Sequence, residues 1–596
     1  MKTNCFAFAA LALPCLFAGA EDLPVPLDEE MPRFHLRDPA TTAEKTAQRL
    51  QLKNPPNCDA SPSVMGHYGS TRQASTWLTG PISNEVDVQI VDFDDALGKQ
   101  VGTSPWHIVS TRRYEEPAAV TVWGTSLTDA YRFVVDGPRF EGLDRFVVNP
   151  LPLSIPWNLV GLDNGRVIIP DQDGFGQKLL RRKQTQDPSF LVLTDDPAGN
   201  GQLDNGISLE QVIEIDTEAV IRLCAFEGGE LLKRFSFTDI NPTYTGEFAV
   251  SAVFEKDGKK STYLVMLDAR LEPIAAEYLD DGIATNARAA ERIDEAKTAI
   301  YLASEDGVIK ATWDSAARTL IRNWERPAGI RGRTGTTPTL LNTRSGEQFV
   351  LLIEAKAAVM SVMNGLIVAS RDDRPSALVA IRREDDLPEG TPKVLRTELP
   401  GWLSTVENSP AVFGETVVVA NYSGYLPNGL LIPAGGHVPE GGPATWMVSP
   451  DAIADFATGI ATLTYDAKTK RFDLLWVDAE VQFSGVPAIS GGANRVYGTG
   501  CEKPSGMTYL YGYRLRTDAE GPAGEQVLRA ELGKAPFRNP TEDRQGNVIF
   551  RRWDYDLQRG EFFDAGNNIV FLEDGSLIVS GGRGLARIRD RKNESE

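Results

Sequence analysis

The sequence predicts an all-β fold, and three observations support this prediction. From about Thr71 onward, short runs of β-branched and aromatic residues alternate with turns rich in Gly, Asp, Asn and Pro, which is typical of strands joined by tight connections. Long stretches with helical periodicity are almost absent. A unit of several strands also recurs along the chain. With 596 residues, of which 42% are hydrophobic, the chain can bury a sizeable core.

The first 20 residues are expected to be a signal peptide and not part of the fold. Lys2 gives a positive start, an apolar run follows, and Ala18-Gly19-Ala20 is a cleavage site. The apolar run is too short for a permanent anchor, and Leu13-Pro14 before Cys15 does not fit a lipoprotein signal. No other stretch is long and apolar enough for a transmembrane helix. We therefore expect a mature chain that starts at Glu21, in the periplasm or outside the cell.

Residues 21–65 are predicted to form an extended lead-in, because they are rich in Pro, Glu and Thr, with one short helix at 41–52. Three similar units then start at Pro338, Pro410 and Pro487, 72 and 77 residues apart. Each unit predicts a four-stranded antiparallel sheet, which buries both of its faces only when copies stack radially. Residues 66–590 are therefore predicted to form a single β-propeller with long loops, followed by a polar tail at 591–596.

The two ends of the propeller are expected to meet. The segment Asn567–Ile588 is the natural last blade, and an N-terminal strand would complete it and close the ring. Trp313, Trp324 and Trp476 occupy repeat-like positions. We predict that they pack between neighbouring blades and do not bind a ligand.

The repeat resembles that of the quinoprotein-like β-propeller superfamily, whose members carry PQQ-like repeats. The matching residues are Ser409 to Val412, Val417 to Val419, Gly424, Tyr465, Asp466 and Trp476. The segment His67–Pro81 also resembles the entry segment of such proteins, with Gly69 and Arg72 in place. The resemblance is firm over about residues 280–590 and loose over 66–280. It implies eight blades, with seven as the alternative.

The same resemblance implies several roles. Some members are dehydrogenases that hold pyrroloquinoline quinone and Ca²⁺ in the axial funnel, which makes both candidate cofactors, while others are non-catalytic scaffolds in envelope assembly. Many alcohol-oxidising members carry an adjacent Cys-Cys pair near the quinone, and this chain has none. The repeat is therefore strong evidence for the fold and weak evidence for a cofactor.

Candidate site residues precede the strand entries, because the first strand of a propeller blade starts near the central channel. Asn286, Thr336 and Asn408 are the candidates for holding a cofactor. Glu407 and Asn408 place a carboxylate beside an amide, a pair that could bind a cation, and Glu407 is also a candidate catalytic residue. The structural alternative is that Asn408 satisfies backbone groups at a strand entry.

Two histidines are candidate general bases. His107 is flanked by aromatic residues, and His437 lies in a Gly-rich loop that could cap the funnel. Either could equally be a packed or surface residue. No G-x-S-x-G motif appears, so no Ser-His-Asp triad is indicated.

Charge and cysteine content limit the partners. Acidic residues outnumber basic ones by 82 to 61, giving a net charge of −21, so a nucleic acid would be repelled. Export leaves Cys58, Cys224 and Cys501, which predicts one disulfide and one free thiol. Pairing Cys58 with Cys501 would tie the lead-in to a late element. The isolated cysteines do not predict a zinc site.

The leading functional hypothesis is an exported enzyme acting on a small organic substrate in the axial funnel, an oxidoreductase of the quinoprotein-like type. One alternative is a non-catalytic binding or assembly scaffold of the envelope, with a protein partner. The other is a cofactor-free hydrolase or lyase that uses acid and base residues of the funnel.

Overall fold

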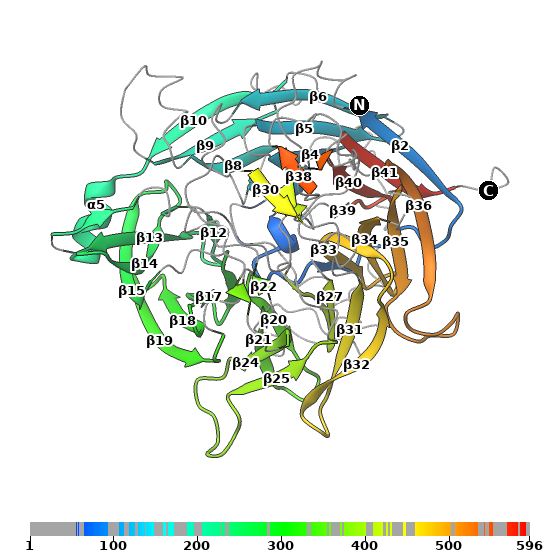
Figure 1. Cartoon of the computed structure of the whole chain (residues 1–596). Coiled ribbons are helices and arrows are strands. Elements are labelled where there is room, and N and C mark those ends of the chain that lie inside the picture. The colour runs from blue at the N-terminus through cyan, green and yellow to red at the C-terminus, as the bar shows by residue number, and fades with distance from the viewer. Residues whose placement is uncertain are drawn as a thin grey trace, which may run out of the picture.

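The computed structural model is a closed ring of eight four-stranded antiparallel blades, which confirms the predicted β-propeller and its blade number (Figure 1). Besides residues 55, 58 and 63, the described residues are 65–92, 107–112, 119–125, 129–137, 139–147, 159–162, 165–171, 188–195, 206–226, 228–232, 236–237, 239–282, 287–330, 334, 336–354, 357–358, 370–371, 375–400, 409–420, 425–426, 430–431, 445–448, 459–501, 507–534, 541–542, 548–551, 569–581 and 584–591. The expected helix at 41–52 lies outside them.

Within a blade, the strands follow one another from the channel outward. Blade 1 consists of β3 (His107–Arg112), β4 (Ala119–Thr125), β5 (Asp129–Asp136) and β6 (Arg139–Val147). Blade 2 consists of β7 (Val160–Leu162), β8 (Arg166–Asp171), β9 (Ser189–Thr194) and β10 (Ser208–Glu214). Blade 3 consists of β12 (Asn241–Pro242) and β11 (Glu230–Leu231), which both pair with β13 (Phe248–Lys256), then β14 (Lys259–Leu267) and β15 (Pro273–Asp281). Blade 4 consists of β16 (Ala289–Arg292), β17 (Lys297–Ala303), β18 (Gly307–Asp314) and β19 (Thr319–Pro327).

The second half of the ring repeats this order. Blade 5 consists of β20 (Thr339–Asn342), β21 (Gln348–Glu354), β24 (Ala377–Arg382) and β25 (Val394–Glu398). Blade 6 consists of β26 (Ala411–Phe413), β27 (Thr416–Ala420), β31 (Ile460–Asp466) and β32 (Arg471–Asp478). Blade 7 consists of β33 (Gln482–Ser490), β34 (Arg495–Cys501), β35 (Met507–Arg514) and β36 (Gln526–Lys534).

Blade 8 closes the ring as predicted. Its three inner strands come from the C-terminal end of the chain, and its outer strand is the N-terminal β2, which pairs antiparallel with β41 from Val86↔Asp590 to Asp92↔Gly584. The strands of blade 8 are β39 (Ile569–Phe571), β40 (Leu577–Gly581), β41 (Gly584–Asp590) and β2 (Val86–Asp92). Joining the two ends in one sheet leaves no blade unpartnered at the seam.

The core lies between the blades. The described residues form eight hydrophobic clusters, and each cluster joins two neighbouring blades around the ring. The predicted packing of the three tryptophans between blades is confirmed: Trp476, for example, stacks on Tyr513 of blade 7 with ring centroids 5.4 Å apart. Burial of the facing sheets of neighbouring blades against each other holds the ring together.

The two faces of the ring differ in their connections. One face, here called the turn face, carries the connections between first and second strands and between third and outer strands. The other, the insertion face, carries the connections between second and third strands and those that lead to the next blade. The longest intervals between consecutive blade strands lie on the insertion face: Glu354 to Ala377, Ala420 to Ile460 and Lys534 to Ile569.

Short additional strands belong to these intervals. β22 (Ala357–Ala358) pairs with β23 (Ser370–Arg371), and β28 (Tyr425–Leu426) pairs with β29 (Leu430–Leu431). β30 (Thr445–Val448), from the blade 6 interval, pairs with β38 (Val548–Arg551), which pairs with β37 (Thr541–Glu542). Connections of different blades therefore form one small sheet, drawn over the central part of the ring in Figure 1.

The structure also contains a helix that the sequence analysis missed. α5 (Thr217–Cys224) follows blade 2, and its N-cap residue Asp216 accepts a hydrogen bond from the Ala219 backbone N–H at 2.8 Å. Val220 and Cys224 are its buried residues. Within the described residues, no helix has the length and apolar character needed to cross a membrane.

Candidate functional site

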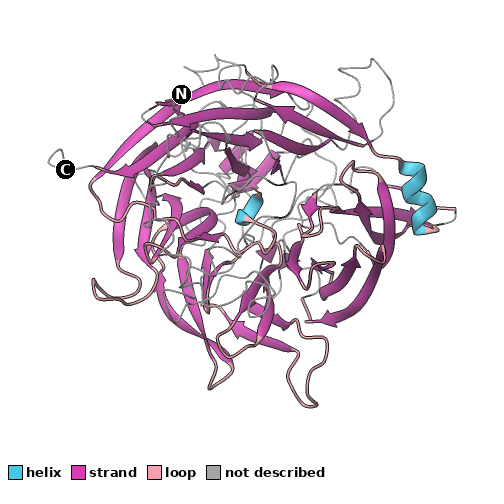
Figure 2. Ribbon diagram, turned by 180° about the vertical axis from the view of Figure 1, so that it is seen from behind, coloured by secondary structure: helices cyan, strands magenta, loops and turns pink. Residues whose placement is uncertain are grey.

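The centre of the ring is occupied by the chain's own N-terminal segment, Ser63–Thr76, here called the plug. Its short 3-10 turn η1 (Gly66–Tyr68) lies at the middle of the ring in both views (Figures 1 and 2). Its last two residues form β1 (Ser75–Thr76), which pairs parallel with β33. The axial funnel, where the sequence analysis expected a substrate, therefore contains protein in this part of the structure.

The plug is bonded to the first strand of every blade. The links, in blade order, are Ser110 N to Ser63 O (2.9 Å), a bridge between Met65 and Val160, Ser70 Oγ to Pro242 O (3.4 Å), Ala290 N to Ser70 O (2.7 Å), Leu340 N to Thr71 O (3.1 Å), Val412 N to Gln73 O (2.8 Å), Ile489 N to Ala74 O (2.9 Å) and Tyr68 OH to Ile569 O (2.5 Å). First strands present an unpaired edge toward the channel, and the plug satisfies part of that edge in each blade.

To reach all the blades, the plug adopts an irregular backbone. His67, Tyr68, Arg72 and Ala74 all have positive φ, between 48° and 66°. Such conformations cost roughly 1 kcal/mol or more each for residues with a Cβ. The surrounding hydrogen bonds and burial compensate for this cost, so the plug is an integral part of the ring.

Arg72 anchors the plug through a fully buried charge cluster. Its guanidinium donates to Gly66 O, Arg288 O and Asn241 Oδ1, all at 2.8 Å, and lies 3.5 Å from Asp239 Oδ2. Arg288 Nη1 lies 3.3 Å from the same carboxylate oxygen. Burial lowers the pKa of Arg288 to about 10, although Asp239 opposes this shift. The cluster holds two guanidinium groups against one carboxylate, beside the axis of the ring.

The candidate base His107 begins β3, in the wall around the plug. It is buried, and burial together with the nearby charge of Arg72 lowers its pKa to about 4. His67 of the plug behaves in the same way: burial, Arg72 and His107 lower its pKa well below the ordinary value. Both imidazoles are therefore neutral at physiological pH. A role for His107 in catalysis stays a prediction.

The other candidate residues are distributed unevenly over the described structure. Thr336 is fully buried, and its hydroxyl accepts a hydrogen bond from the Ile353 backbone N–H at 3.1 Å and lies 2.9 Å from Thr334 Oγ1. It therefore supports the strand entry of blade 5. Asn286, Glu407, Asn408 and His437 lie outside the described residues, so their proposed roles stay predictions.

The described part of the channel does not fit the quinone and Ca²⁺ that the resemblance implies. Two buried guanidinium groups, of Arg72 and Arg288, lie beside the axis and have the same sign of charge as Ca²⁺. Within the described residues, no grouping of three or more His, Cys, Asp or Glu side chains could hold a metal ion. No reaction step through these groups is derived.

The predicted disulfide is wrong. Cys58 and Cys224 are both buried thiols outside any disulfide, so Cys58 is not paired with Cys501. Cys58 forms a bridge to Leu162 of blade 2, and both thiols belong to the cluster between blades 2 and 3. Cys58 is thus held by backbone pairing and burial in place of a covalent bond.

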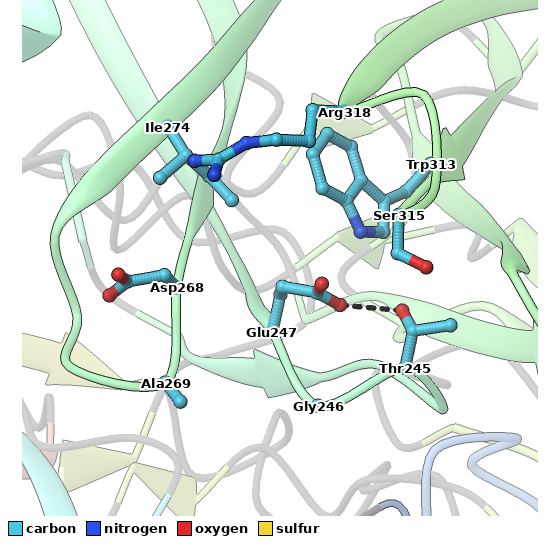
Figure 3. Close-up of a pocket in the computed structure, with 9 residues that line it drawn as sticks. All are labelled: Thr245, Gly246, Glu247, Asp268, Ala269, Ile274, Trp313, Ser315 and Arg318. Carbon is cyan, nitrogen blue, oxygen red and sulfur yellow. Dashed lines mark hydrogen bonds between the residues drawn. The ribbon is translucent and has the colours of Figure 1, made fainter.

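A cavity of about 400 Å³ lies on the turn face between blades 3 and 4 (Figure 3). It is lined by Thr245, Gly246, Glu247, Asp268, Ala269, Ile274, Trp313, Ser315 and Arg318. These residues come from the two turns of blade 3 on this face, from β15, and from the end of β18 with the turn that follows it. The cavity combines two carboxylates, one guanidinium and an aromatic wall, and sequence analysis did not predict it.

Comparisons with known proteins add little beyond the fold. No family model matches the chain, and no curated protein matches its sequence. Among solved structures, Sqt1 of Saccharomyces cerevisiae has 10% identity and a TM-score of 0.40, covering 86% of this chain and 100% of its own. Hsv2 of Kluyveromyces lactis has 10% identity and a TM-score of 0.31, over 71% and 88%. A puromycin-hydrolyzing peptidase of Mycobacterium tuberculosis has 11% identity and a TM-score of 0.29, over 79% and 62%.

These similarities are too weak to support an argument about function. The propeller fold is shared by scaffold proteins and enzymes, so the function has to be argued from the residues of this chain.

Proposed function

We propose that this protein is an exported binding or assembly module in which the propeller serves as a rigid platform. The observation that carries the proposal is the plug, which is bonded to all eight blades and occupies the axial position where a propeller enzyme would hold its substrate. The signal peptide predicted from residues 1–20 of the sequence supports a location in the periplasm or outside the cell.

The same observation weighs against the quinoprotein-type oxidoreductase. An axial enzyme needs a cavity with a few converging polar groups. Most polar atoms of Arg72, Asp239 and Arg288 instead contact each other, the backbone or the Asn241 side chain. Thr336, a candidate for holding the cofactor, already bonds to a strand. The polar groups beside the axis thus hold the plug in place.

The partner is proposed to bind on the insertion face. The longest connections of the ring lie there, and β30 and β38 join connections of different blades into a single sheet. Loops on a rigid scaffold are where recognition surfaces are usually built. The net charge of −21 favours a partner with a basic or neutral surface over a nucleic acid.

Site-specific photo-crosslinking in the exporting cells tests this proposal. A crosslinking residue would replace Glu305, which is exposed in the turn between β17 and β18 on the insertion face, or Lys468, which is exposed between β31 and β32 on the turn face. We expect a discrete adduct from position 305 and none from position 468. Equal labelling at both positions would contradict the proposed face.

A cofactor measurement provides the opposite test. Purified protein would be mixed with PQQ and Ca²⁺ and then freed of unbound ligand by gel filtration. Retained quinone absorbance together with dye-linked dehydrogenase activity would overturn the proposal and favour the oxidoreductase. A bare polypeptide without activity, combined with the crosslink at position 305, is the result expected of a binding module.

A further inference from the structure

We propose that the cavity between blades 3 and 4 is a binding site for a zwitterionic α-amino acid. This inference does not depend on the partner proposed above, since the cavity lies on the turn face and the partner surface on the insertion face. It is argued from the charges in the cavity and from a second blade interface in which the chain fills the equivalent space itself.

The charged groups of the cavity face the same space without touching. Arg318 is exposed in the turn after β18, and its guanidinium extends across the cavity toward Ile274 (Figure 3). No ion pair joins it to Glu247 or Asp268 within the described structure, so its nitrogens lie more than 4.0 Å from both carboxylates. A ligand that carries both signs of charge can bridge that gap, because each end then meets its counter-charge.

The carboxylates are held in place by their own turns. Glu247 Oε2 accepts hydrogen bonds from Thr245 Oγ1 (2.5 Å) and Thr243 Oγ1 (3.1 Å). Asp268 Oδ1 accepts from the backbone N–H groups of Arg270 (2.8 Å) and Glu272 (3.0 Å). In each carboxylate, both hydrogen bonds are made to the same oxygen atom, Oε2 of Glu247 or Oδ1 of Asp268. Two carboxylates positioned in this way form a receptor for an ammonium group.

Trp313 supplies the apolar wall. Its side chain is fully buried, and its indole Nε1–H has no hydrogen-bond acceptor in the described part of the chain. A buried donor without an acceptor costs roughly 1–3 kcal/mol. A ligand carboxylate held by Arg318, or a water bound with it, would bring an acceptor to this region.

The interface between blades 5 and 6 is a second copy of this one. The turn Thr343–Glu347 repeats Thr243–Glu247 with the same bond from the threonine hydroxyl to the glutamate carbonyl, at 3.1 Å and 3.0 Å. Lys470 repeats Arg318, at φ values of 55° and 53°. Tyr465, just before the shared aspartate of the third strand, repeats Trp313. The two interfaces can therefore be compared position by position.

In the second copy, large side chains fill the space. Phe349, Tyr465 and Phe472 form a cluster with ring centroids 5.2–6.0 Å apart. The corresponding residues of the first copy are Ala249, Trp313 and Leu320. Ala249 and Leu320 are smaller than the phenylalanines at the matching positions of the second copy. Trp313 is larger than Tyr465, but this difference restores only part of the lost side-chain volume. Two of the three compared positions therefore hold smaller side chains in the first copy than in the second.

The second copy also provides its own cation. Arg382 stands opposite Phe349 in the sheet, with its guanidinium 5.1 Å from the centroid of that ring. Burial alone would raise the pKa of Glu347, but bonds from Ser345 and Thr343 and the charge of Arg382 hold this pKa below its ordinary value. At the matching position of blade 3, opposite Ala249, stands Met266. Glu247 thus lacks the internal cation that Glu347 has.

These comparisons define the ligand. Its cationic group takes the place beside Glu247 that Arg382 takes beside Glu347, and its anionic group pairs with Arg318. Because the cavity holds charges of both signs that form no ion pair with each other and its volume is about 400 Å³, a small molecule with both an ammonium and a carboxylate group fits best. An α-amino acid has this chemistry, and the volume lies in the range of small-molecule sites.

Isothermal titration calorimetry of the full mature chain with each of the twenty L-amino acids tests the proposal. We expect at least one of them to bind with a Kd on the order of 1 mM or tighter. Its N-acetyl derivative, which lacks the ammonium charge, and its amide, which lacks the carboxylate, should each bind at least about tenfold more weakly.

Matched variants locate the site. Arg318→Gln and Glu247→Gln should each weaken binding at least about tenfold, whereas Lys470→Gln, in the equivalent turn of blade 6, should leave Kd within about twofold. Arg318 is exposed in a turn, so its variant keeps the fold, and thermal unfolding of each variant checks this. No heat with any amino acid, or unchanged binding in both cavity variants, would overturn the proposal.

Discussion

Lowering the pH from 7 to 5 should destabilise the propeller through His107 in a way that one substitution can isolate. His107 begins β3 and is 8% exposed. Burial, and then the charge of Arg72, lower its pKa from the ordinary value of 6.5 to about 4. His67, beside it in the plug, shifts in the same direction. The folded protein thus keeps the His107 ring largely neutral at pH 5, while the unfolded chain protonates it.

The sign and the size follow from proton binding. Between pH 6.5 and 4 the unfolded chain binds a proton at His107 that the folded chain does not, so the free energy of unfolding falls as the pH falls. The loss is about 1.4 kcal/mol per pH unit across that window. For His107 alone it reaches about 2 kcal/mol at pH 5 and about 3 kcal/mol at pH 4. His67 adds a further loss in the same direction.

Urea unfolding at pH 7, 6 and 5 measures the effect in the wild-type protein and in His107→Gln. Because glutamine does not titrate, the variant should lose about 2 kcal/mol less than the wild type between pH 7 and pH 5. Both proteins share the same carboxylates, which cancel in the difference. Parallel pH profiles for the two proteins, or a His107 that titrates near 6.5 in the folded state by NMR, would refute the reasoning.

Three further predictions concern the plug, the blade interfaces and the thiols. Arg72→Met leaves Asp239 with one fewer buried partner and should lower the free energy of unfolding by about 3–5 kcal/mol; wild-type urea stability would contradict the anchoring role. Trp476→Phe removes the bond from Nε1 to Leu515 O at 3.2 Å and should cost about 1 kcal/mol, whereas Trp476→Ala should cost about 3–5 kcal/mol; equal melting curves for both variants would count against interblade packing. Dithiothreitol should leave Tm unchanged, because Cys58 and Cys224 are thiols; a fall of several degrees would reveal a disulfide.

Part of the cavity between blades 3 and 4 could have been predicted from the sequence by comparing the blade interfaces. Thr243–Glu247 and Thr343–Glu347 have the same length and nearly the same chemistry, and aligning them places Ala249 against Phe349. Sequence analysis found the proline entries and did not make this second alignment. Even with the alignment, the cavity is lined by residues from both turns of blade 3, from β15 and from blade 4, so its volume could be found only in the packed structure.

The site residues predicted near the strand entries show a different limit. Thr336 was correctly predicted to precede the first strand of a blade. Its hydroxyl, however, accepts a hydrogen bond from the Ile353 backbone N–H, a partner that the spacing of the repeat does not indicate. His107 was singled out for its chemistry, and the structure adds the burial and the nearby Arg72 that make it neutral. Residue type therefore suggested the chemistry, while the environment set the protonation state.

By itself, the sequence determined the all-β class, the repeating four-stranded blade and the pairing of N- and C-terminal strands, while the export signal stays a prediction. These features depend on local alternation, turn residues and repeated motifs, which act over a few residues and survive without tertiary information. Only the tertiary structure decided that Ser63–Thr76 fills the channel, that Cys58 stays a thiol and that a cavity opens between blades 3 and 4. Each of these rests on contacts between distant segments, such as Arg72 with Arg288, 216 residues apart, where burial and side-chain volume are set by the closed ring and not by neighbours in the chain.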